Sequence, residues 1–417
     1  MSMLDLLGDR RAWERFYEYK TSLVCPEELK RKLRNYIDGE CWLPVVDAIK
    51  RGGAFPLPKK TVISKMSTQK KRIVFTYPER ENTVLKLLTY LLLRRYDGIF
   101  APVLFSFRPG RTAKDALVSL LRTPGVTRMY SYKVDVSDYF NSIPVERLLP
   151  MLREVTADDK PLYGFLSRLL SEPDALENGR PVRVKKGIMA GTPLASFYAN
   201  LYLSGLDRLF FEAGVPYARY SDDIILFAPT EAEVRAHADA VRCFLSECGL
   251  SVNPSKEEFL SPGEGFTFLG FICRGGTVDV APASVKKIKA KMRRKARALA
   301  RWRDRNDLDG EKAAKAFIRV FNRKLFENPA ADELTWTYWF FPVITTSESL
   351  RIIDRYAQDC VRFLLTGKRT KARFSARYED MKALGLRSLV HAYYDRSEEE
   401  RSRRRAAARE DENGHTL

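Results

Sequence analysis

Two short segments place acidic residues on stretches that otherwise have the pattern of apolar strands. In YKVDVSDYFNSI, Asp135 follows Val134 on a predicted strand, and in RYSDDIILF, Asp222 and Asp223 lie at the bend of a predicted hairpin. Ionised carboxylates are costly to bury in a sheet unless they bind a cation. On neighbouring strands, Asp135 and Asp222 could converge on two divalent ions about 3.5–4 Å apart, the arrangement used for nucleotidyl displacement. Oxygen ligands of this kind suit Mg²⁺, and Mn²⁺ is a second option.

An Asp-Asp pair at a bend also has a simpler explanation. Asp is a common turn residue, so YSDD taken alone is as consistent with turn chemistry as with catalysis. Its interpretation therefore depends on the rest of the chain.

Composition narrows the class of protein. The 417 residues carry 72 Lys and Arg against 53 Asp and Glu, a formal net charge of +19, which favours a polyanionic partner such as nucleic acid. The N-terminal segment has no signal-peptide pattern and no stretch has the length and apolarity of a membrane span, so we expect a cytoplasmic protein that does not enter a membrane. The six cysteines form no CxxC pair, which argues against a zinc site or a disulfide framework.

The order of predicted elements indicates an α+β architecture. Strands TVIS and RIVFTY form a predicted hairpin with a basic tip, and two further strand regions alternate with helices. We expect five regions, namely an N-terminal helical extension (1–58), fingers (59–131), palm (132–278, with a helical insertion near 145–186), a helical thumb with C-terminal helices (279–396) and a charged tail (397–417).

After residue 282 the chain becomes an amphipathic, strongly basic helix. One stripe holds apolar residues and the other faces are cationic, which is either a solvated surface or a track for nucleic-acid phosphates. The aromatic residues that we expect to form the core of this helical region are Trp302, Trp336, Tyr338, Trp339 and Phe340.

Between residues 61 and 271 a series of motifs resembles the bacterial reverse transcriptases of group II introns and retrons, and in particular the stand-alone, defence-associated enzymes. The motifs occur in the family's order: ISKMSTQKKRIVFTYP, FSFRPGRTAKDAL, KVDVSDYFNSI, GIMAGTPLASFYANLYL, YSDD, NPSKEEF and FTFLGF. This resemblance implies a right-hand polymerase with fingers, an antiparallel palm sheet and a helical, basic thumb.

The resemblance also implies roles for individual residues. Asp135, Asp222 and Asp223 match the catalytic and metal-binding acids, Val136 offers a carbonyl to the metals, and Lys256 matches the lysine that protonates pyrophosphate. The positions matching nucleotide-binding residues are Lys65, Arg72, Phe140 and Gly191. The positions expected to bind primer or template are Arg108, Arg111, Tyr220, Phe268, Leu269, Gly270, Lys287, Lys291 and Arg294.

Phe140 bears on the choice of sugar. A large ring five residues after the metal aspartate would collide with a 2′-hydroxyl, which favours deoxynucleoside triphosphates as substrates. One departure from the family pattern is Ala190, because many group II relatives have Gln before the glycine that corresponds to Gly191. This departure points away from standard intron proteins.

The main hypothesis is therefore an RNA-directed DNA polymerase that copies a dedicated, structured non-coding RNA in phage defence and holds an RNA–DNA duplex. A template-independent or protein-primed DNA polymerase on the same fold is a second hypothesis, and a non-catalytic RNA-binding or maturase-like factor is a third. The sequence does not predict the oligomeric state.

Overall fold

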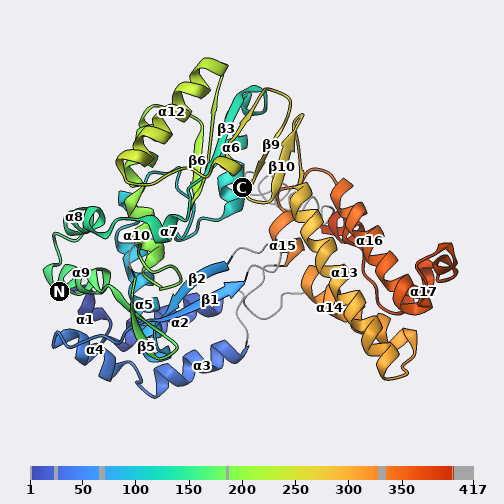
Figure 1. Ribbon diagram of the computed structural model, residues 1–417, viewed down its shortest axis with the longest axis horizontal. Coiled ribbons are helices and arrows are strands. Elements are labelled where there is room, and N and C mark those ends of the chain that lie inside the picture. Colours follow the sequence, from blue (N-terminus) through green and yellow to red (C-terminus); the bar gives the residue numbers. More distant parts are fainter. Residues whose placement is uncertain are drawn as a thin grey trace, which may run out of the picture. The chain divides into compact units, whose positions relative to one another are not determined.

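The computed structural model describes residues 2–22, 27–64, 71–184, 187–326, 335–396 and 398, and they divide into two compact units (Figure 1). Unit 1 spans Met1–Glu264 and unit 2 spans Gly265–Leu417. The expected palm extends to residue 278, but the strands after Gly265 belong to unit 2. A hydrogen bond of 2.8 Å from the Thr345 amide to the Val278 carbonyl is one of the contacts that join them to its helices.

Unit 1 begins with four helices, α1 (Met3–Leu6), α2 (Arg10–Ser22), α3 (Glu27–Asp38) and α4 (Leu43–Lys50). They fold because each buries an apolar face. Trp13 of α2 stacks on Trp42 with ring centroids 5.2 Å apart, and its indole N–H donates to the Leu7 carbonyl at 2.8 Å. The predicted N-terminal helical extension is thus a packed part of unit 1.

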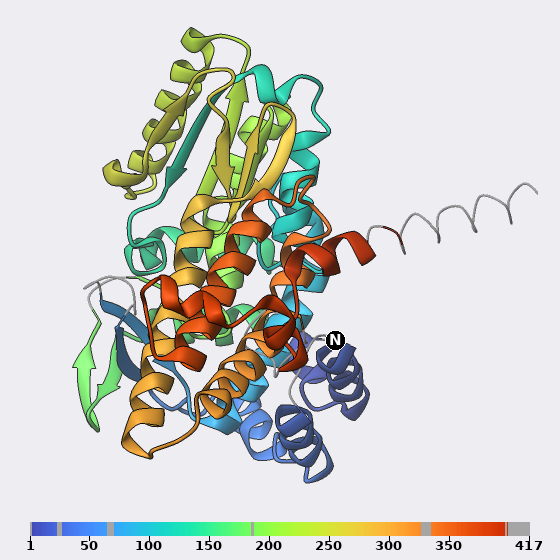
Figure 2. The same ribbon diagram turned by 90° about the vertical axis from the view of Figure 1, so that its right-hand side faces the viewer.

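The first sheet of unit 1 has the strand order β2-β1-β4-β5. Its strands are β1 (Lys59–Ser64), β2 (Lys71–Thr76), β4 (Asp174–Glu177) and β5 (Arg180–Arg183). The predicted β1–β2 hairpin is present, but β4 and β5 lie in the region where we expected only helices. Figure 2 shows this green β4–β5 hairpin beside the blue strands, and Lys59 of β1 pairs in parallel with Leu176.

The second sheet has the order β6-β7-β3-β8, with every pair antiparallel. Its strands are β3 (Tyr130–Asp135), β6 (Tyr217–Tyr220), β7 (Asp223–Ala228) and β8 (Glu258–Leu260). One face is apolar because alternate residues such as Val134 and Ile224 point into the core. This is the antiparallel sheet expected of a palm.

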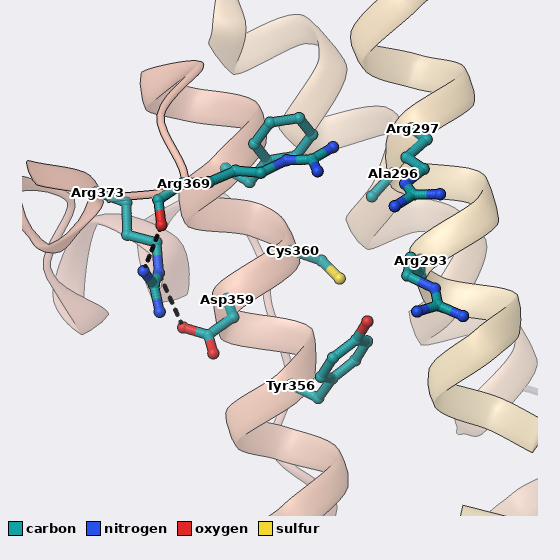
Figure 3. A pocket seen from close by; sticks show the side chains of 9 residues that line it. Arg293, Ala296, Arg297, Tyr356, Asp359, Cys360, Arg369 and Arg373 are labelled. Atoms are coloured by element: carbon teal, nitrogen blue, oxygen red, sulfur yellow. Dashed lines mark hydrogen bonds and ion pairs between the residues drawn. The ribbon is translucent and has the colours of Figure 1, made fainter. Parts of the chain in front are cut away.

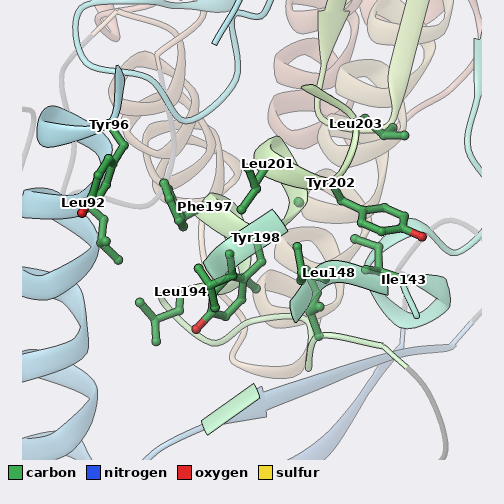
Figure 4. Close-up of a cluster of buried hydrophobic side chains, with 14 of the residues drawn as sticks. Leu92, Tyr96, Ile143, Leu148, Leu194, Phe197, Tyr198, Leu201, Tyr202 and Leu203 are labelled. Atoms are coloured by element: carbon green, nitrogen blue, oxygen red, sulfur yellow. The ribbon is translucent and has the colours of Figure 1, made fainter. Parts of the chain in front are cut away.

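Helices surround these sheets. They are α5 (Glu79–Arg95), α6 (Ala113–Leu121), α7 (Tyr139–Ser142), α8 (Val145–Val155), α9 (Lys160–Ser171), α10 (Ala195–Tyr202), α11 (Ser204–Glu212) and α12 (Glu231–Glu247). Short 3-10 turns span Asp97–Ile99, Val126–Arg128 and Pro254–Lys256. Helix α10 is buried on all sides, and Figure 4 shows its Phe197 and Tyr198 between Leu92 of α5 and Leu148 of α8. A helix without a polar face must lie in the core, which fixes α10 at the centre of unit 1.

Unit 2 combines a small sheet with a helical bundle. The sheet has the order β11-β10-β9, with β9 (Phe266–Phe268), β10 (Phe271–Arg274) and β11 (Thr277–Val280). The helices are α13 (Pro282–Arg305), α14 (Gly310–Leu325), α15 (Trp336–Phe340), α16 (Glu348–Thr366) and α17 (Tyr378–Ala383), with a 3-10 turn at Lys371–Ser375 and helical residues at 389–396. Helices α13, α14 and α16 pack on one another.

The prediction that five aromatic residues form the core of unit 2 is wrong in part. Phe340 is buried, but Trp302 is 39% exposed and Tyr338 is 62% exposed. Trp302 lies in the last turn of α13, at the end of its apolar stripe. The expected charged tail lies outside the described residues, apart from residue 398. No helix of the described residues is long and apolar enough to cross a bilayer.

Candidate active site

The palm sheet brings the three acidic residues together. Strands β3 and β7 pair so that Asp135 lies directly opposite Asp223, and directly opposed residues of an antiparallel pair point to the same face. Asp222 occupies the turn that joins β6 to β7, and its carbonyl accepts a hydrogen bond of 3.1 Å from the Val136 amide. This register places acids that are far apart in the sequence side by side. It also pairs apolar residues with each other, as Val134 with Ile224.

The turn itself has a strained backbone. Ser221 has a φ of +62°, a left-handed conformation that costs a non-glycine residue about 1 kcal/mol or more. Two hydrogen bonds hold it there: its amide donates to the Ser106 hydroxyl at 2.8 Å, and its carbonyl accepts from an Arg219 Nη at 3.2 Å. Both partners are fully buried, so the position of Asp222 is fixed from beneath the turn.

Arg219 is itself held in place by an ion pair with Asp207. The Arg219 guanidinium donates to both Asp207 carboxylate oxygens, at 2.7 and 2.5 Å, and also to the Asn200 carbonyl at 3.2 Å. Tyr217 adds a hydrogen bond of 2.9 Å to the same carboxylate. This network was not predicted from the sequence; its one signal is the single charged residue, Arg219, in the otherwise uncharged strand β6.

The surroundings of Asp222 and Asp223 disfavour the charge of these two acids. Burial, followed by repulsion from Asp135, raises the pKa of Asp222. Burial, followed by repulsion from Asp222 and Asp135, raises the pKa of Asp223 to about 6. Crowded carboxylates of this kind are a common feature of functional sites, because a bound cation relieves both the burial and the repulsion.

Lys256 provides a positive charge at the same place. Its Nζ lies 2.5 Å from Asp135 Oδ1, and the same ammonium lowers the pKa of Asp222 and of Asp223 against the larger effects of burial and repulsion. The short Pro254–Lys256 turn positions it, since the Asn253 amide donates to the Asp135 carbonyl at 2.8 Å. The lysine side chain is 53% exposed, so its ammonium also reaches solvent.

The donor set fits Mg²⁺ better than a metal that requires an all-protein cage. Among the described residues, no group of three His, Cys, Asp or Glu side chains is gathered tightly enough to enclose an ion. Mg²⁺ usually takes one or two carboxylates and completes its shell with water and substrate phosphates. Asp135 and Asp222 are suited to such a partial site, and Val136, which is 1% exposed, follows Asp135 directly.

The loop 187–191 is held between the segment that carries Phe140 and strand β2. The Ile188 amide donates to the Phe140 carbonyl at 2.8 Å, and a Cβ at Gly187 would lie 2.4 Å from the Asn141 Cα. At the other end of the loop, the Phe75 amide of β2 donates to the Ala190 carbonyl at 2.8 Å, and a Cβ at Gly191 would lie 3.1 Å from the Phe75 carbonyl. The loop thereby connects the half-buried Phe140 to the strand that carries Arg72.

The family follows from a comparison of the sequence with known families. Residues 57–273, which include every residue of the site described above, match the family "Reverse transcriptase (RNA-dependent DNA polymerase)". The chain belongs to this reverse transcriptase family. Its α+β fold is accordingly the right-hand polymerase fold, with the antiparallel β6-β7-β3-β8 sheet as palm and the helices of unit 2 as thumb.

Individual relatives are distant. The chain is 24% identical over 185 residues to the group II intron-encoded protein LtrA of Lactococcus lactis subsp. cremoris, covering 43% of this chain and 30% of the relative. It is 29% identical over 155 residues to a 91 kDa protein in the cob intron of Schizosaccharomyces pombe, covering 36% of this chain and 18% of the relative. It therefore spans less than a third of the length of either. Among solved structures, apo telomerase from Candida tropicalis aligns with a TM-score of 0.46 at 11% identity, over 79% of this chain and 68% of that one.

The other residues expected to bind nucleotide or template lie in different settings. Lys65 is outside the described residues, and Arg72 lies on β2 opposite Ile63. Arg108 is buried, and its guanidinium donates to Asp97 at 2.7 and 3.0 Å and to the Ala101 carbonyl at 2.7 Å. This geometry favours a structural role for Arg108 over the expected contact with template. Arg111 is half-buried and donates to the Pro102 carbonyl at 2.5 Å.

The expected primer and duplex residues divide between the two units. Tyr220 is in unit 1, at the end of β6, where burial raises its pKa. In unit 2, Leu269 and Gly270 have φ angles of +49° and +90°, which make the two-residue turn of the β9–β10 hairpin after Phe268. The three basic residues expected to contact the duplex are on α13, where two are exposed and one is half-buried: Lys287, Arg294 and Lys291.

Proposed function

We propose that this protein is an RNA-directed DNA polymerase that joins deoxynucleotides by two-metal nucleotidyl transfer. The observation that carries the proposal is the pairing of Asp135 with Asp223 across β3 and β7, with Asp222 held in the adjoining turn. Two bound Mg²⁺ ions would activate the primer 3′-hydroxyl and stabilise the leaving pyrophosphate. Asp135 and Asp222 would hold the ions, Asp223 would support them, and the Val136 carbonyl would complete a shell.

The other residues of the site act on substrate. Lys256 carries the proton that we assign to the leaving pyrophosphate, because its ammonium already lies at the carboxylates where that group must form. Arg72 and Lys65 bind the triphosphate, Phe140 excludes a 2′-hydroxyl, and Gly191 lets the nucleotide approach the backbone. The primer is supported by Tyr220 and by the turn at Phe268, Leu269 and Gly270. The phosphates of the duplex are contacted by Lys287, Lys291 and Arg294. The template strand is contacted by Arg111.

The template that we propose is a structured non-coding RNA, and the biological role is phage defence. The net charge of +19 supports a large polyanionic partner. Ala190, which stands where many group II relatives have Gln, supports a branch separate from the intron proteins. Ala190 also favours a second candidate function, a template-independent or protein-primed DNA polymerase, because its methyl group makes none of the polar contacts of a glutamine.

The decisive experiment combines Asp222→Asn with Asp223→Asn and compares the variant with the wild-type protein. We expect the variant to lose primer extension on an RNA template with deoxynucleotides and Mg²⁺, because amides bind divalent cations far more weakly than carboxylates, while RNA binding is kept. A control with Glu154→Gln and Glu212→Gln removes the same charge from exposed positions on α8 and α11 and should extend primers normally.

The same proteins, purified from cells, identify the template. One abundant RNA with complementary DNA, absent from the variant, is the expected result. DNA that is not complementary to the RNA would replace the proposal with untemplated synthesis. RNA without DNA in both samples would leave a binding factor.

A further inference from the structure

Unit 2 contains a second basic site on the helices of the thumb. A pocket of about 240 Å³ lies between α13, α16 and the 3-10 turn at Lys371–Ser375 (Figure 3). Four arginines and one carboxylate line it, together with a tyrosine, a phenylalanine and a small apolar floor. The lining residues are Arg293, Ala296, Arg297, Tyr356, Asp359, Cys360, Phe363, Arg369 and Arg373.

Two of the arginines are held in place by the protein. The Arg369 guanidinium carbon lies 4.8 Å from the centre of the Phe363 ring. Arg373 donates to the Arg369 carbonyl at 2.8 Å, and its Nε lies 3.5 Å from the Asp359 carboxylate, as Figure 3 shows. Guanidinium groups that are ordered before binding lose less entropy when they contact an oxyanion.

The other two arginines come from α13 and lack such constraints. Arg293 and Arg297 are exposed, and in the part of the chain that the structure describes no carboxylate forms an ion pair with either. Their side chains project from successive turns of one helix face. The pocket thus holds four cations against one acid, an imbalance that an anionic ligand would correct.

This site is separate from the expected duplex track. At about 100° per residue, Arg293 and Arg297 are rotated on average roughly 105° around α13 from Lys287, Lys291 and Arg294. The two pocket arginines therefore point away from the middle of that track, although Arg294 lies next to them.

We propose that this pocket binds the phosphate group of a nucleotide, in addition to the polymerase site and whether or not that site is active. Several arginines around one concave site match the geometry of phosphate oxygens, which accept paired hydrogen bonds from guanidinium groups. The aromatic rings do not offer a base-stacking platform, because Arg369 lies over Phe363 and the Lys289 ammonium lies 4.9 Å from the centre of Tyr356. The pocket therefore recognises its ligand through the phosphate group and not through the base. This phosphate belongs either to an RNA strand or to a free nucleotide.

The test uses the full-length chain and a fluorescent single-stranded 12-nucleotide RNA, without metal or deoxynucleotides, so that polymerase activity has no influence. Arg293→Gln with Arg297→Gln should weaken binding by about tenfold or more, as expected for the loss of charge-assisted hydrogen bonds. The matched control, Lys312→Gln with Arg319→Gln, removes two exposed charges from α14 outside the pocket. It should change the affinity by less than about threefold, because only general attraction is lost.

Further arms of the test separate the sources of phosphate. Tighter binding of a 5′-phosphorylated RNA than of a 5′-hydroxyl RNA, seen only with an intact pocket, assigns a strand end, and equal binding assigns an internal phosphodiester. Displacement of the RNA by millimolar AMP assigns a free nucleotide. In the wild-type protein, each ligand should also protect Arg293 and Arg297 from phenylglyoxal, measured by mass spectrometry. Equal losses in the two double variants, together with no protection, would overturn the proposal.

Discussion

Arg219 carries a full charge in the interior of unit 1, and the turn that presents Asp222 depends on it. Its side chain and that of Asp207 are both 0% exposed, so neither charge has solvent as a substitute partner. Removing one member of a buried ion pair leaves the other uncompensated, which costs about 3–5 kcal/mol. Arg219→Met should therefore lower the free energy of unfolding by that amount in urea denaturation.

Replacing both partners gives the matched comparison. Asp207→Leu combined with Arg219→Met leaves no buried charge, so we expect it to recover most of the lost stability. It should still synthesise DNA poorly, since the Ser221 carbonyl and the Asn200 carbonyl lose their donor. Full activity in the double variant would show that the network does not position the turn.

Phe140 offers a test of sugar selection. Its ring is half-buried beside Tyr139, at 5.6 Å between centroids, while its carbonyl is fixed by the Ile188 amide at 2.8 Å. Phe140→Val should keep the backbone and shorten the side chain, raising the relative use of ribonucleotides by about tenfold or more. Primer extension with matched ribo- and deoxynucleotides measures the ratio. An unchanged ratio would assign Phe140 to the core alone.

The three acids could be predicted from the sequence because a carboxylate on an apolar strand interrupts the local pattern. The Arg219–Asp207 pair could not, since a charged residue in a sequence is usually exposed and its partner depends on the packing of α11 against β6. Arg108 is the opposite case. Its motif predicts contact with nucleic acid, but nearby carbonyls and Asp97 occupy its donors.

At the scale of elements, the loop 187–191 depends on close backbone contact. Gly187 has a φ of +91°, and a Cβ there would lie 2.6 Å from the Phe140 carbonyl oxygen as well as against Asn141. Gly187→Ala must therefore displace the segment that carries Phe140, and we expect primer extension to fall by at least about tenfold.

Gly179 supplies the control for that change. It has a φ of +81° at the β4–β5 turn, but a Cβ at this position would have no neighbouring atom within 4 Å. Gly179→Ala introduces the same left-handed strain, about 1 kcal/mol, without the clash. Equal activity losses in the two variants would attribute the effect of Gly187→Ala to strain alone.

Long elements with a clear period were predictable, and short ones were not. Helix α13 begins at Pro282, where the sequence predicts a basic helix, and β3 and β7 lie on the strands predicted beside the acids, because each has an apolar face or run. Strands β4 and β5 have only four residues each, and β5 contains Pro181 and is largely exposed. Neither strand therefore has the alternation of apolar and polar residues that indicates a strand in a sequence. Their position follows instead from pairing with β1, which is a tertiary contact.

The α13–α14 pair contains a group that links pH to nucleic-acid binding. Burial, followed by repulsion from Lys291, lowers the pKa of Lys324 from 10.5 to about 8. Because the folded pKa is the lower one, this lysine destabilises the fold below about pH 8, and that cost disappears as the pH rises from about 8 to 10.5.

A phosphate at Lys291 and Lys324 would restore the charged form of Lys324. We therefore expect the protein to take up protons when it binds an RNA–DNA duplex at pH 8. Calorimetry in two buffers with different ionisation enthalpies measures this uptake. Lys324→Met should remove the buffer dependence, whereas a dependence that persists would place the proton elsewhere.

At the scale of the whole molecule, charge rather than shape determines how the chain meets its partner. Both units contribute to the net charge of +19, and the basic helix α13 contributes a large share of it. Contacts to phosphates release counterions, so affinity should depend on salt more strongly than for a protein that reads only base edges.

This dependence distinguishes an extended track from a single small site. If the chain contacts about 6–10 phosphates of a long RNA, its affinity should fall by about 10³-fold or more between 50 and 200 mM salt. The Asp222→Asn, Asp223→Asn variant should have an equal or slightly shallower slope, because it loses two negative charges but no phosphate contact. A slope that corresponds to only one or two phosphates, measured by titration across salt concentrations, would confine RNA binding to one small site and contradict an extended phosphate track.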